Sequence, residues 1–312
     1  MRPFLNLGGH MKIIIDKHFY EIVTKAFPEI EFYTEIDQCP DAEAVIGQPE
    51  LMQKGNLEKL PELSWLQLFR AGFDMLDMDY IRKRGIILCN GKDIFSIPIA
   101  EDVVCKILMH STNAFKYLEN KKSHIWDNHL KRDELNGQTI GIIGTGSIAT
   151  EIAKRLQPFG VKILGYKKTP VISMPYFDEI YAGKKGLEFV MANSDYLVVT
   201  ADLNKDTYHL INKDNIKFMK ETASVINIAR GAIINEEDLK DALKNKTISY
   251  AGLDVFEVEP LPENDDLWNM DNVYITPHAC ALVKQNKDRW EKLIIKNIKN
   301  FIENETLINV VK

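Results

Sequence analysis

A glycine-rich turn between two apolar segments constrains this chain more than any other feature. The run from Thr139 to Ile143 is short, apolar and rich in β-branched residues, which is typical of a buried strand. Gly144-Thr145-Gly146 follows it, and from Ile148 to Phe159 apolar side chains recur every three to four residues, the period of one helix face. Strand, glycine turn and helix in this order predict a dinucleotide site, because the helix N-terminus offers unpaired N–H groups and glycine lets a pyrophosphate approach the backbone.

The surroundings of this turn support the prediction, which would be weak from the glycines alone. The pattern is G-x-G-x-x-A, with Ala149 where a third glycine usually stands, and the dinucleotide-binding fingerprint permits that replacement. The β-rich segment from Val161 to Tyr166 comes next, so strand, helix and strand follow one another as the fingerprint requires.

Short β-rich runs alternate with helical segments over most of the chain. Such alternation predicts an α/β fold with parallel sheets and helices on their faces. A length of 312 residues suggests about two domains. Helices are also expected at 99–117, from 235 onward and at 284–304. Strands are expected at 12–16, 30–34, 44–47, 66–69, 86–90, 139–143, 161–166, 196–200, 223–229, 250–256 and 272–276.

The composition excludes several classes of function. Hydrophobic residues make up 45% and charged residues 27%, ordinary values for a soluble protein with a sizeable core. No run approaches the roughly 18 apolar residues that span a membrane, and a net charge of −6 without a basic block argues against nucleic acid as a partner. Cys39, Cys89, Cys105 and Cys280 lack metal-ligand spacing, so we expect reduced thiols in the cytoplasm and no metal site.

Charged or titratable residues stand at or just beyond the carboxyl ends of three expected strands. They are Arg230, Glu259 and His278. In a doubly wound sheet these ends border the crevice in which a cofactor lies. Each alone has an ordinary alternative, namely a surface arginine, a solvated carboxylate and a turn histidine, but the three together predict a site. Arg70 and Gly72 follow an earlier strand and form a second candidate wall, unless they make only an ordinary turn.

Taken together, the motifs of this chain resemble those of the D-isomer-specific 2-hydroxyacid dehydrogenases. The resemblance covers nearly all of residues 11–312. It implies an oxidoreductase that reduces a 2-oxo acid to a D-2-hydroxy acid with NAD(P)H and runs the reverse reaction. The motifs that carry it are Gly144–Gly146, Asn227–Asn235 leading to Leu239, Leu253–Pro260 and Thr276–His278.

The resemblance also implies a division into two Rossmann-like or flavodoxin-like domains. A substrate-binding domain would comprise residues 11–105 and 285–312, and a dinucleotide-binding domain residues 106–284. The active site would lie in the cleft between them, and the protein would be a homodimer. Residues 1–10 fit no element, and we expect a leader from cloning because His10-Met11 is what a common cloning site encodes.

The three residues at the strand ends suit this chemistry. Arg230 can clamp the substrate carboxylate through two parallel N–H bonds, which lysine cannot do. His278 as an imidazolium can give a proton to the oxygen on which negative charge develops, and can act as the base in the oxidation. Glu259 would orient the ring of His278 and favour its charged form. The dinucleotide supplies the hydride, and the protein supplies placement and electrostatics.

The expected contacts extend beyond this trio. Asp254 should lie on the nicotinamide carboxamide side, and the backbone after Arg70 should help to hold the substrate carboxylate. We expect substrate contacts at Arg70, Ala71, Gly72, Phe73, Arg230 and His278. We expect cofactor contacts at Gly144, Thr145, Gly146, Ser147, Ile148, Lys167, Lys168, Thr169, Ala201, Thr207, Ile228, Ala229, Arg230, Asp254 and His278.

One departure from the usual pattern bears on the cofactor. An acidic residue about 20 residues beyond the glycines normally binds the adenosine ribose 2′-hydroxyl. Here Tyr166 is followed by Lys167-Lys168-Thr169, with no carboxylate. Lysines attract a 2′-phosphate that a carboxylate would repel. The sequence therefore predicts a preference for NADP(H), the alternative being that the lysines point to solvent and NAD(H) serves.

Two other functions compete with this interpretation. Formate dehydrogenase shares the architecture but pairs its histidine with glutamine, so Glu259 argues against it. A non-catalytic dinucleotide-sensing protein could keep the same three residues. The substrate side chain stays open: the loop around Arg70 and the C-terminal helix with Trp290 would select it, and Arg70 could bind a second anionic group or pair with a carboxylate.

Overall fold

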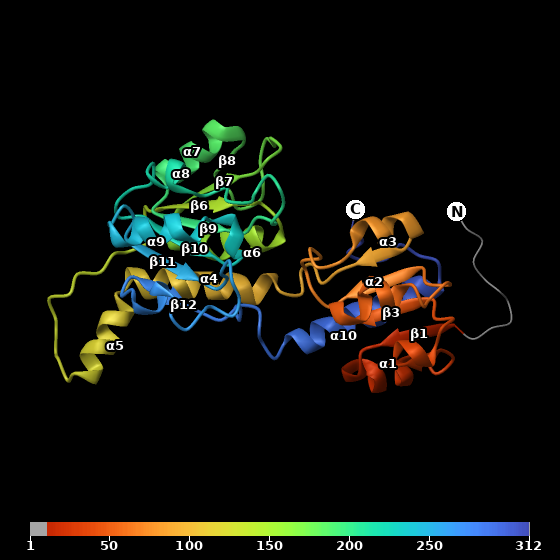
Figure 1. Ribbon diagram of the computed structural model, residues 1–312. Coiled ribbons are helices and arrows are strands. Elements are labelled where there is room, and N and C mark those ends of the chain that lie inside the picture. Colours follow the sequence, from red (N-terminus) through yellow and green to blue (C-terminus); the bar gives the residue numbers. More distant parts are fainter. Residues whose placement is uncertain (1–10, 312) are drawn as a thin grey trace. The chain divides into compact units, whose positions relative to one another are not determined.

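The computed structural model of the protein describes residues 11–311, so the expected leader at 1–10 lies outside the described residues (Figure 1). The described chain forms two compact units, residues 11–95 with 283–311 and residues 96–282. The second unit begins with the helix at Ser96, earlier than the boundary expected after residue 105. The assignment of substrate and dinucleotide to separate domains stays a prediction.

The first unit is built on a five-stranded parallel sheet with the order β2-β1-β3-β4-β5. This is the flavodoxin-like order, in which the chain reverses direction between β1 and β3. Its elements are β1 (Lys12–Ile15), α1 (Tyr20–Ala26), β2 (Glu31–Tyr33), β3 (Ala44–Gly47), α2 (Lys54–Leu57), β4 (Trp65–Leu68), α3 (Met78–Arg84), β5 (Ile87–Cys89) and α10 (Asn286–Ile302).

Alternating side chains of these strands fill two apolar layers, one on each face of the sheet. Ile13 and Ile15 pack with α1 and α10 on one face, whereas Ile14 packs with α2 and α3 on the other. This is the period of two expected of a strand that is buried on both faces. The C-terminal helix α10 therefore completes the core of the first unit and brings Trp290 into it.

The second unit is built on a seven-stranded parallel sheet with the order β12-β11-β10-β9-β6-β7-β8. Its elements are α4 (Ser96–Ser111), α5 (Ala114–Lys122), β6 (Thr139–Ile143), α6 (Ser147–Leu156), β7 (Lys162–Tyr166), β8 (Glu179–Tyr181), α7 (Gly183–Asn193), β9 (Tyr196–Val199), α8 (Lys213–Ile216), β10 (Ser224–Asn227), α9 (Glu236–Lys244), β11 (Tyr250–Leu253) and β12 (Val273–Ile275).

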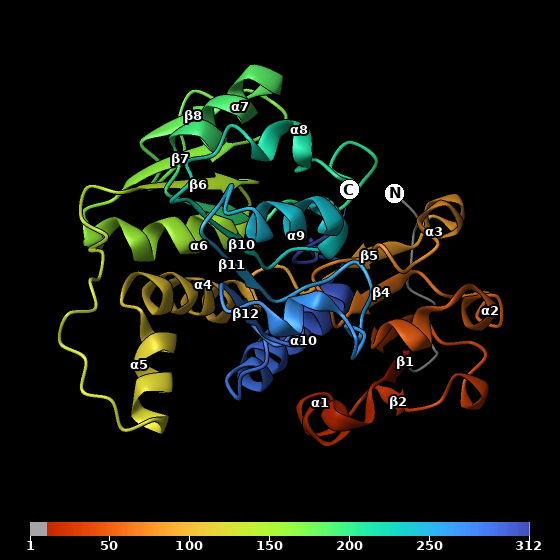
Figure 2. The same cartoon turned by 60° about the vertical axis from the view of Figure 1, so that its left-hand side comes forward.

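The order of this sheet is that of a Rossmann fold, because the chain works outward from β6 to β8 and then outward from β9 to β12. Helices α4 and α6 cover one face, and α7, α8 and α9 cover the other (Figures 1 and 2). The predicted α/β class with parallel sheets is confirmed in both units. The reversal point between β6 and β9 is where such folds bind their ligands.

Two elements differ from the sequence prediction. The edge strand β8 (Glu179–Tyr181) was not expected, since it has three residues and begins with a glutamate. The helix expected at 99–117 is two helices, α4 and α5, because Asn113 between them takes a left-handed φ of 55°. Among residues 11–311 no helix is both long and apolar enough to cross a membrane.

Candidate active site

The turn after β6 combines one crowded glycine with one open glycine. Gly144 has a φ of 95°, and a Cβ there would lie 2.8 Å from the backbone nitrogen of Ala201. Gly146 is the extended N-cap of α6, and a Cβ there would meet no atom within 4 Å. Gly144 is therefore required for the fold, whereas Gly146 keeps the space in front of the helix N-terminus free. That space and the N–H groups facing it suit a pyrophosphate.

The expected cofactor residues lie along one edge of the seven-stranded sheet, because all of its strand pairs are parallel. The ends of β6 and β9 are bonded directly, with Thr200 Oγ1 donating to the carbonyl oxygen of Ile143 at 3.1 Å. From these ends continue Gly144–Ile148 after β6, Lys167–Thr169 after β7, Ala201 and Thr207 after β9, Ile228–Arg230 after β10, Asp254 and Glu259 after β11, and His278 after β12.

The lysines after β7 have different surroundings. Lys168 Nζ lies 2.7 Å from Asp206 Oδ2 in the loop after β9, and both side chains are exposed. This hydrogen bond raises the pKa of Lys168 and lowers the pKa of Asp206. Lys167 is half-buried, and its backbone N–H donates to the carbonyl oxygen of Tyr181 at 3.0 Å. Sequence reasoning missed Asp206, because nothing in the local pattern says that the two loops meet.

The loop that carries Arg230 is shaped by a buried asparagine. The side-chain amide of Asn227 donates to the carbonyl oxygen of Arg230 at 3.0 Å and accepts from the N–H of Ala229 at 3.1 Å. A Cβ on Gly231 would lie 1.9 Å from the carbonyl carbon of Phe256. The loops after β10 and β11 are thus in direct contact, and the position of Arg230 is coupled to the loop that leads to Glu259.

His278 and Glu259 form a hydrogen-bonded pair. His278 Nδ1 lies 2.8 Å from Glu259 Oε2, and the other oxygen of Glu259 accepts from the N–H of Phe256 at 3.0 Å. His278 has a φ of 50°, and its N–H donates to the carbonyl oxygen of Asp254 at 2.8 Å. Both side chains of the pair are partly exposed. The structure therefore brings together the acid–base couple that the sequence predicts.

Asp254 faces the loop of His278. Its buried carboxylate accepts from Thr276 Oγ1 at 2.5 Å and from the N–H groups of Ala279 at 2.9 Å and Cys280 at 3.2 Å. Its expected contact with the nicotinamide stays a prediction. Burial raises the pKa of the Cys280 thiol, so this cysteine carries no thiolate at neutral pH.

Lys106 is a residue that sequence reasoning missed. It lies in α4, its side chain is fully buried, and its Nζ donates to the carboxylate of Asp102 and to Thr276 Oγ1 at 3.0 Å. Burial raises the pKa of Asp102, and the hydrogen bond from Lys106 opposes this. The available signal was its spacing, because Lys106 follows the buried residues Ile99 and Val103 on the apolar face of the helix.

The loop after β4 in the first unit carries the expected substrate contacts Arg70, Ala71, Gly72 and Phe73. Arg70 is exposed, and its carbonyl oxygen accepts from the N–H of Gly91 at 2.7 Å. Phe73 packs against the apolar layer of α2 and α3. Trp290 is buried, with its ring 4.7 Å from that of Phe69, so it belongs to the core.

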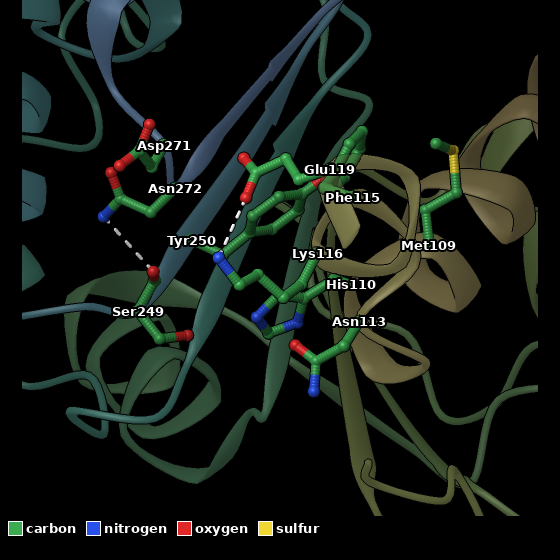
Figure 3. Close-up of a pocket in the computed structure, with 10 residues that line it drawn as sticks. All are labelled: Met109, His110, Asn113, Phe115, Lys116, Glu119, Ser249, Tyr250, Asp271 and Asn272. Atoms are coloured by element: carbon green, nitrogen blue, oxygen red, sulfur yellow. Dashed lines mark hydrogen bonds and ion pairs between the residues drawn. The ribbon is translucent and has the colours of Figure 1, made fainter. Parts of the chain in front are cut away.

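A pocket of about 270 Å³ lies at the other edge of the seven-stranded sheet, where β11 and β12 begin (Figure 3). His110 stacks there on the ring of Tyr250, and Lys116 pairs with Glu119 at 3.0 Å. None of the expected site residues lines this pocket. The candidate active site is therefore not this pocket but the opposite edge of the sheet, where the strands end and the expected residues lie.

Known proteins similar to this chain identify its family. The family described as D-isomer specific 2-hydroxyacid dehydrogenase, NAD binding domain, matches residues 104–280. A glyoxylate reductase of Pyrococcus horikoshii is 35% identical over 271 residues, which are 83% of this chain and 80% of that protein. A glyoxylate/hydroxypyruvate reductase B of Pectobacterium atrosepticum is 30% identical over 299 residues, which are 95% of this chain and 92% of that protein.

A solved structure is similar over nearly the whole chain. A D-isomer specific 2-hydroxyacid dehydrogenase family protein from Aeromonas salmonicida has a TM-score of 0.86 and 30% identity, with 97% of this chain and 99% of that chain covered. The same family is indicated by the two parallel sheets, by the glycine turn at the reversal point and by relatives that match most of the chain. The chain belongs to the D-isomer specific 2-hydroxyacid dehydrogenase family and is an enzyme of that class that uses a nicotinamide dinucleotide.

Proposed function

We propose that this enzyme reduces a small 2-oxo acid, glyoxylate or hydroxypyruvate, to its 2-hydroxy acid, with the D configuration where the product is chiral and with NADPH as the preferred cofactor. The observation that carries the proposal is the pair of His278 Nδ1 and Glu259 Oε2, 2.8 Å apart, at the same sheet edge as the glycine turn. The names of the relatives from Pyrococcus horikoshii and Pectobacterium atrosepticum support the substrate class.

Each residue of the trio has a separate task. Gly144–Gly146 and the N-terminus of α6 would hold the dinucleotide, which would supply the hydride. Arg230 clamps the substrate carboxylate by two parallel N–H bonds, which fixes the face of the carbonyl group. Glu259 engages Nδ1 of His278, so Nε2 is the nitrogen that gives its proton to the carbonyl oxygen as charge develops there.

The preference for NADPH rests on Lys167 and Lys168. Both follow β7, the position from which the adenosine ribose is bound in this fold. A 2′-phosphate would find two cations there, although Asp206 shares one of them. None of the ion pairs among the described residues involves Lys167.

We also propose that the enzyme is a homodimer in the cytoplasm. Helix α5 and the segment after it extend from the sheet of the second unit (Figures 1 and 2). They expose Leu118, Ile125 and Trp126, the last with 93% of its surface accessible. Apolar side chains gathered on one segment are typical of an interface. Light scattering of the protein and of Trp126→Ser tests this: a native monomer would contradict it.

The activity is tested by following the absorbance of NADPH and NADH with glyoxylate, hydroxypyruvate, pyruvate and a bulkier 2-oxo acid. We expect turnover of glyoxylate and hydroxypyruvate, with a higher kcat/KM for NADPH than for NADH. A clear preference for NADH would contradict the cofactor assignment. Tight dinucleotide binding without turnover of any acid would contradict the enzymatic role of the trio and favour a sensor.

A further inference from the structure

The surroundings of Lys106, the buried lysine of α4, match both its charge and its size. The Nζ atom of Lys106 meets the carboxylate of Asp102 and the hydroxyl of Thr276, and lies 5.4 Å from the ring centre of Tyr274. A Cβ on Gly252 would lie 3.3 Å from Cδ of Lys106, so a glycine in β11 leaves room for the aliphatic part of the side chain. The ammonium is therefore held in one place from several sides.

From Lys106 a chain of hydrogen bonds leads to the backbone around the catalytic histidine. The hydroxyl of Thr276 accepts from Lys106 Nζ at 3.0 Å and uses its single proton to donate to Asp254 Oδ1 at 2.5 Å. The same oxygen of Asp254 accepts the N–H of Ala279 at 2.9 Å. The backbone is thus tied on both sides of His278, which lies between Thr276 and Ala279.

An apolar residue would fill the space of Lys106 at a lower cost in solvation. Its neighbours on the same helix face, Val103 and Ile107, are apolar and fully buried. A buried ammonium is costly unless it is paired and hydrogen-bonded. Packing alone therefore does not account for a lysine here. What the charge adds is compensation for two carboxylates, those of Asp102 and of the fully buried Asp254.

We propose that Lys106 is a positioning residue that acts through Thr276 and Asp254 to hold His278 in the orientation for proton transfer. The inference rests on the proposed role of His278. The left-handed φ of 50° at His278 supports it, because a residue with a Cβ keeps such a backbone only where the surroundings impose it. Lys106 does not touch the substrate or the cofactor in this role.

The test compares Lys106→Met, which keeps the length of the side chain, with Thr276→Val, which keeps the shape but removes the hydroxyl. Each should lower kcat by about 10-fold to 100-fold, as expected when a catalytic group is displaced by about 1 Å. The KM of the 2-oxo acid and the Kd of NADPH, measured by its fluorescence, should change by less than about threefold. Thr276→Ser, which keeps the hydroxyl, should retain most of the kcat that Thr276→Val loses.

The double variant Lys106→Met/Thr276→Val decides whether the two residues act as one chain. The kcat of the double variant should be no lower than that of the single variant with the lower kcat, because the second change interrupts a connection that is already broken. Losses that multiply in the double variant, or a kcat within about twofold of native in either single variant, would overturn the inference. If Lys106→Met does not fold, Lys106→Gln takes its place in the single and the double variant.

Failure of this inference is distinguishable from failure of the proposed function. If native enzyme turns over glyoxylate and His278→Ala does not, the function stands whatever Lys106→Met does. If His278→Ala keeps its kcat, the proton donor is misassigned, and Lys106 has no histidine to position.

Discussion

The glycine turn after β6 and the loop of His278 after β12 lie at the same sheet edge, but they are determined in different ways. The turn is determined mainly by the backbone of consecutive residues, above all by the φ of 95° at Gly144, and the close approach of Ala201 adds to this. The loop of His278 is fixed by side chains far away in the sequence, since Lys106 and Thr276 are 170 residues apart. One end of the site is local and the other depends on the whole fold.

This difference separates the expected effects of mutation. Around the glycines the protein offers backbone and empty space, so substitutions there should change the affinity for the dinucleotide. Around His278 the protein offers a proton and its supports, so substitutions there should change kcat. Experiment can contradict either statement, and the four tests that follow run from the largest expected effect to the smallest.

His278→Ala removes the proton donor and should lower kcat by about 10²-fold to 10⁴-fold, the usual contribution of general acid catalysis. The Kd of NADPH should rise by much less than kcat falls, because the glycine turn that would bind the pyrophosphate is untouched even though His278 is itself an expected cofactor contact. Steady-state kinetics at saturating cofactor, together with cofactor fluorescence, measure the two effects. An unchanged kcat, or a Kd that rises as much as kcat falls, would break the separation between the two ends.

Gly231→Ala tests whether the loops of Arg230 and Glu259 depend on their close contact. The added Cβ would lie 1.9 Å from the carbonyl carbon of Phe256, so this residue must move, and its N–H is the group that holds Glu259. A shift of about 1 Å at a catalytic group costs about 10²-fold in kcat/KM. Gly55→Ala is the matched control, because a Cβ there meets nothing within 4 Å.

The measurement for Gly231→Ala is kcat/KM for the 2-oxo acid beside the melting temperature. We expect both to fall, whereas Gly55→Ala changes neither by much. A variant that melts lower but keeps its kcat/KM would mean that the loop absorbs the methyl group without moving Arg230 or Glu259.

The local end of the site could be predicted from sequence, and the reason is physical. A strand, two glycines and an amphipathic helix determine their own geometry, so Gly144 and Gly146 identify the turn without knowledge of the rest. Arg230, Glu259 and His278 could be found because parallel strands bring their carboxyl ends to one edge. The residues at the strand ends could therefore be grouped into one site even though the strands are far apart in the chain.

The supports of these residues could not be predicted in the same way. Lys106 lies on a helix face that otherwise reads as core, and Asp206 lies in a loop without a recognisable pattern. Only the packing of α4 against β11 and β12, and of two loops after β7 and β9, brings them to their partners. The break at Asn113 was missed, although asparagine is one of the few residues other than glycine that readily take a left-handed φ.

Gly144→Ala and Gly146→Ala form a pair that sharpens the local end. Alanine at Gly144 is strained by its φ and by the contact with Ala201, so the variant should melt at a lower temperature. Alanine at Gly146 meets no protein atom and should leave the melting temperature unchanged. Both should raise the Kd of NADPH, Gly146→Ala by about tenfold, because a methyl group in front of α6 blocks hydrogen bonds to a phosphate.

Melting curves with and without NADPH measure both properties at once. Gly146→Ala should lose most of the stabilisation that the cofactor gives, at an unchanged melting temperature of the free protein. If Gly146→Ala bound NADPH as the native enzyme does, the open space before α6 would not be the phosphate site.

Asp206→Asn is expected to have the smallest effect, and it tests which cations the 2′-phosphate meets. The change releases Lys168 and removes a negative charge, so the KM of NADPH should fall by about twofold to fivefold while that of NADH stays the same. The hydrogen bond from Lys168 lowers the pKa of Asp206, so the carboxylate is charged at every pH from 6 to 9 and the effect should not vary over this range.

Because both side chains are exposed, the gain in Asp206→Asn should shrink as salt is added. Asp206→Glu keeps the charge and is the control, and Lys168→Met should shift the KM of NADPH in the opposite direction. Equal changes for NADPH and NADH would mean that the pair of Lys168 and Asp206 shapes the loops rather than the choice of cofactor. The choice between NADPH and NADH would then have to rest on Lys167.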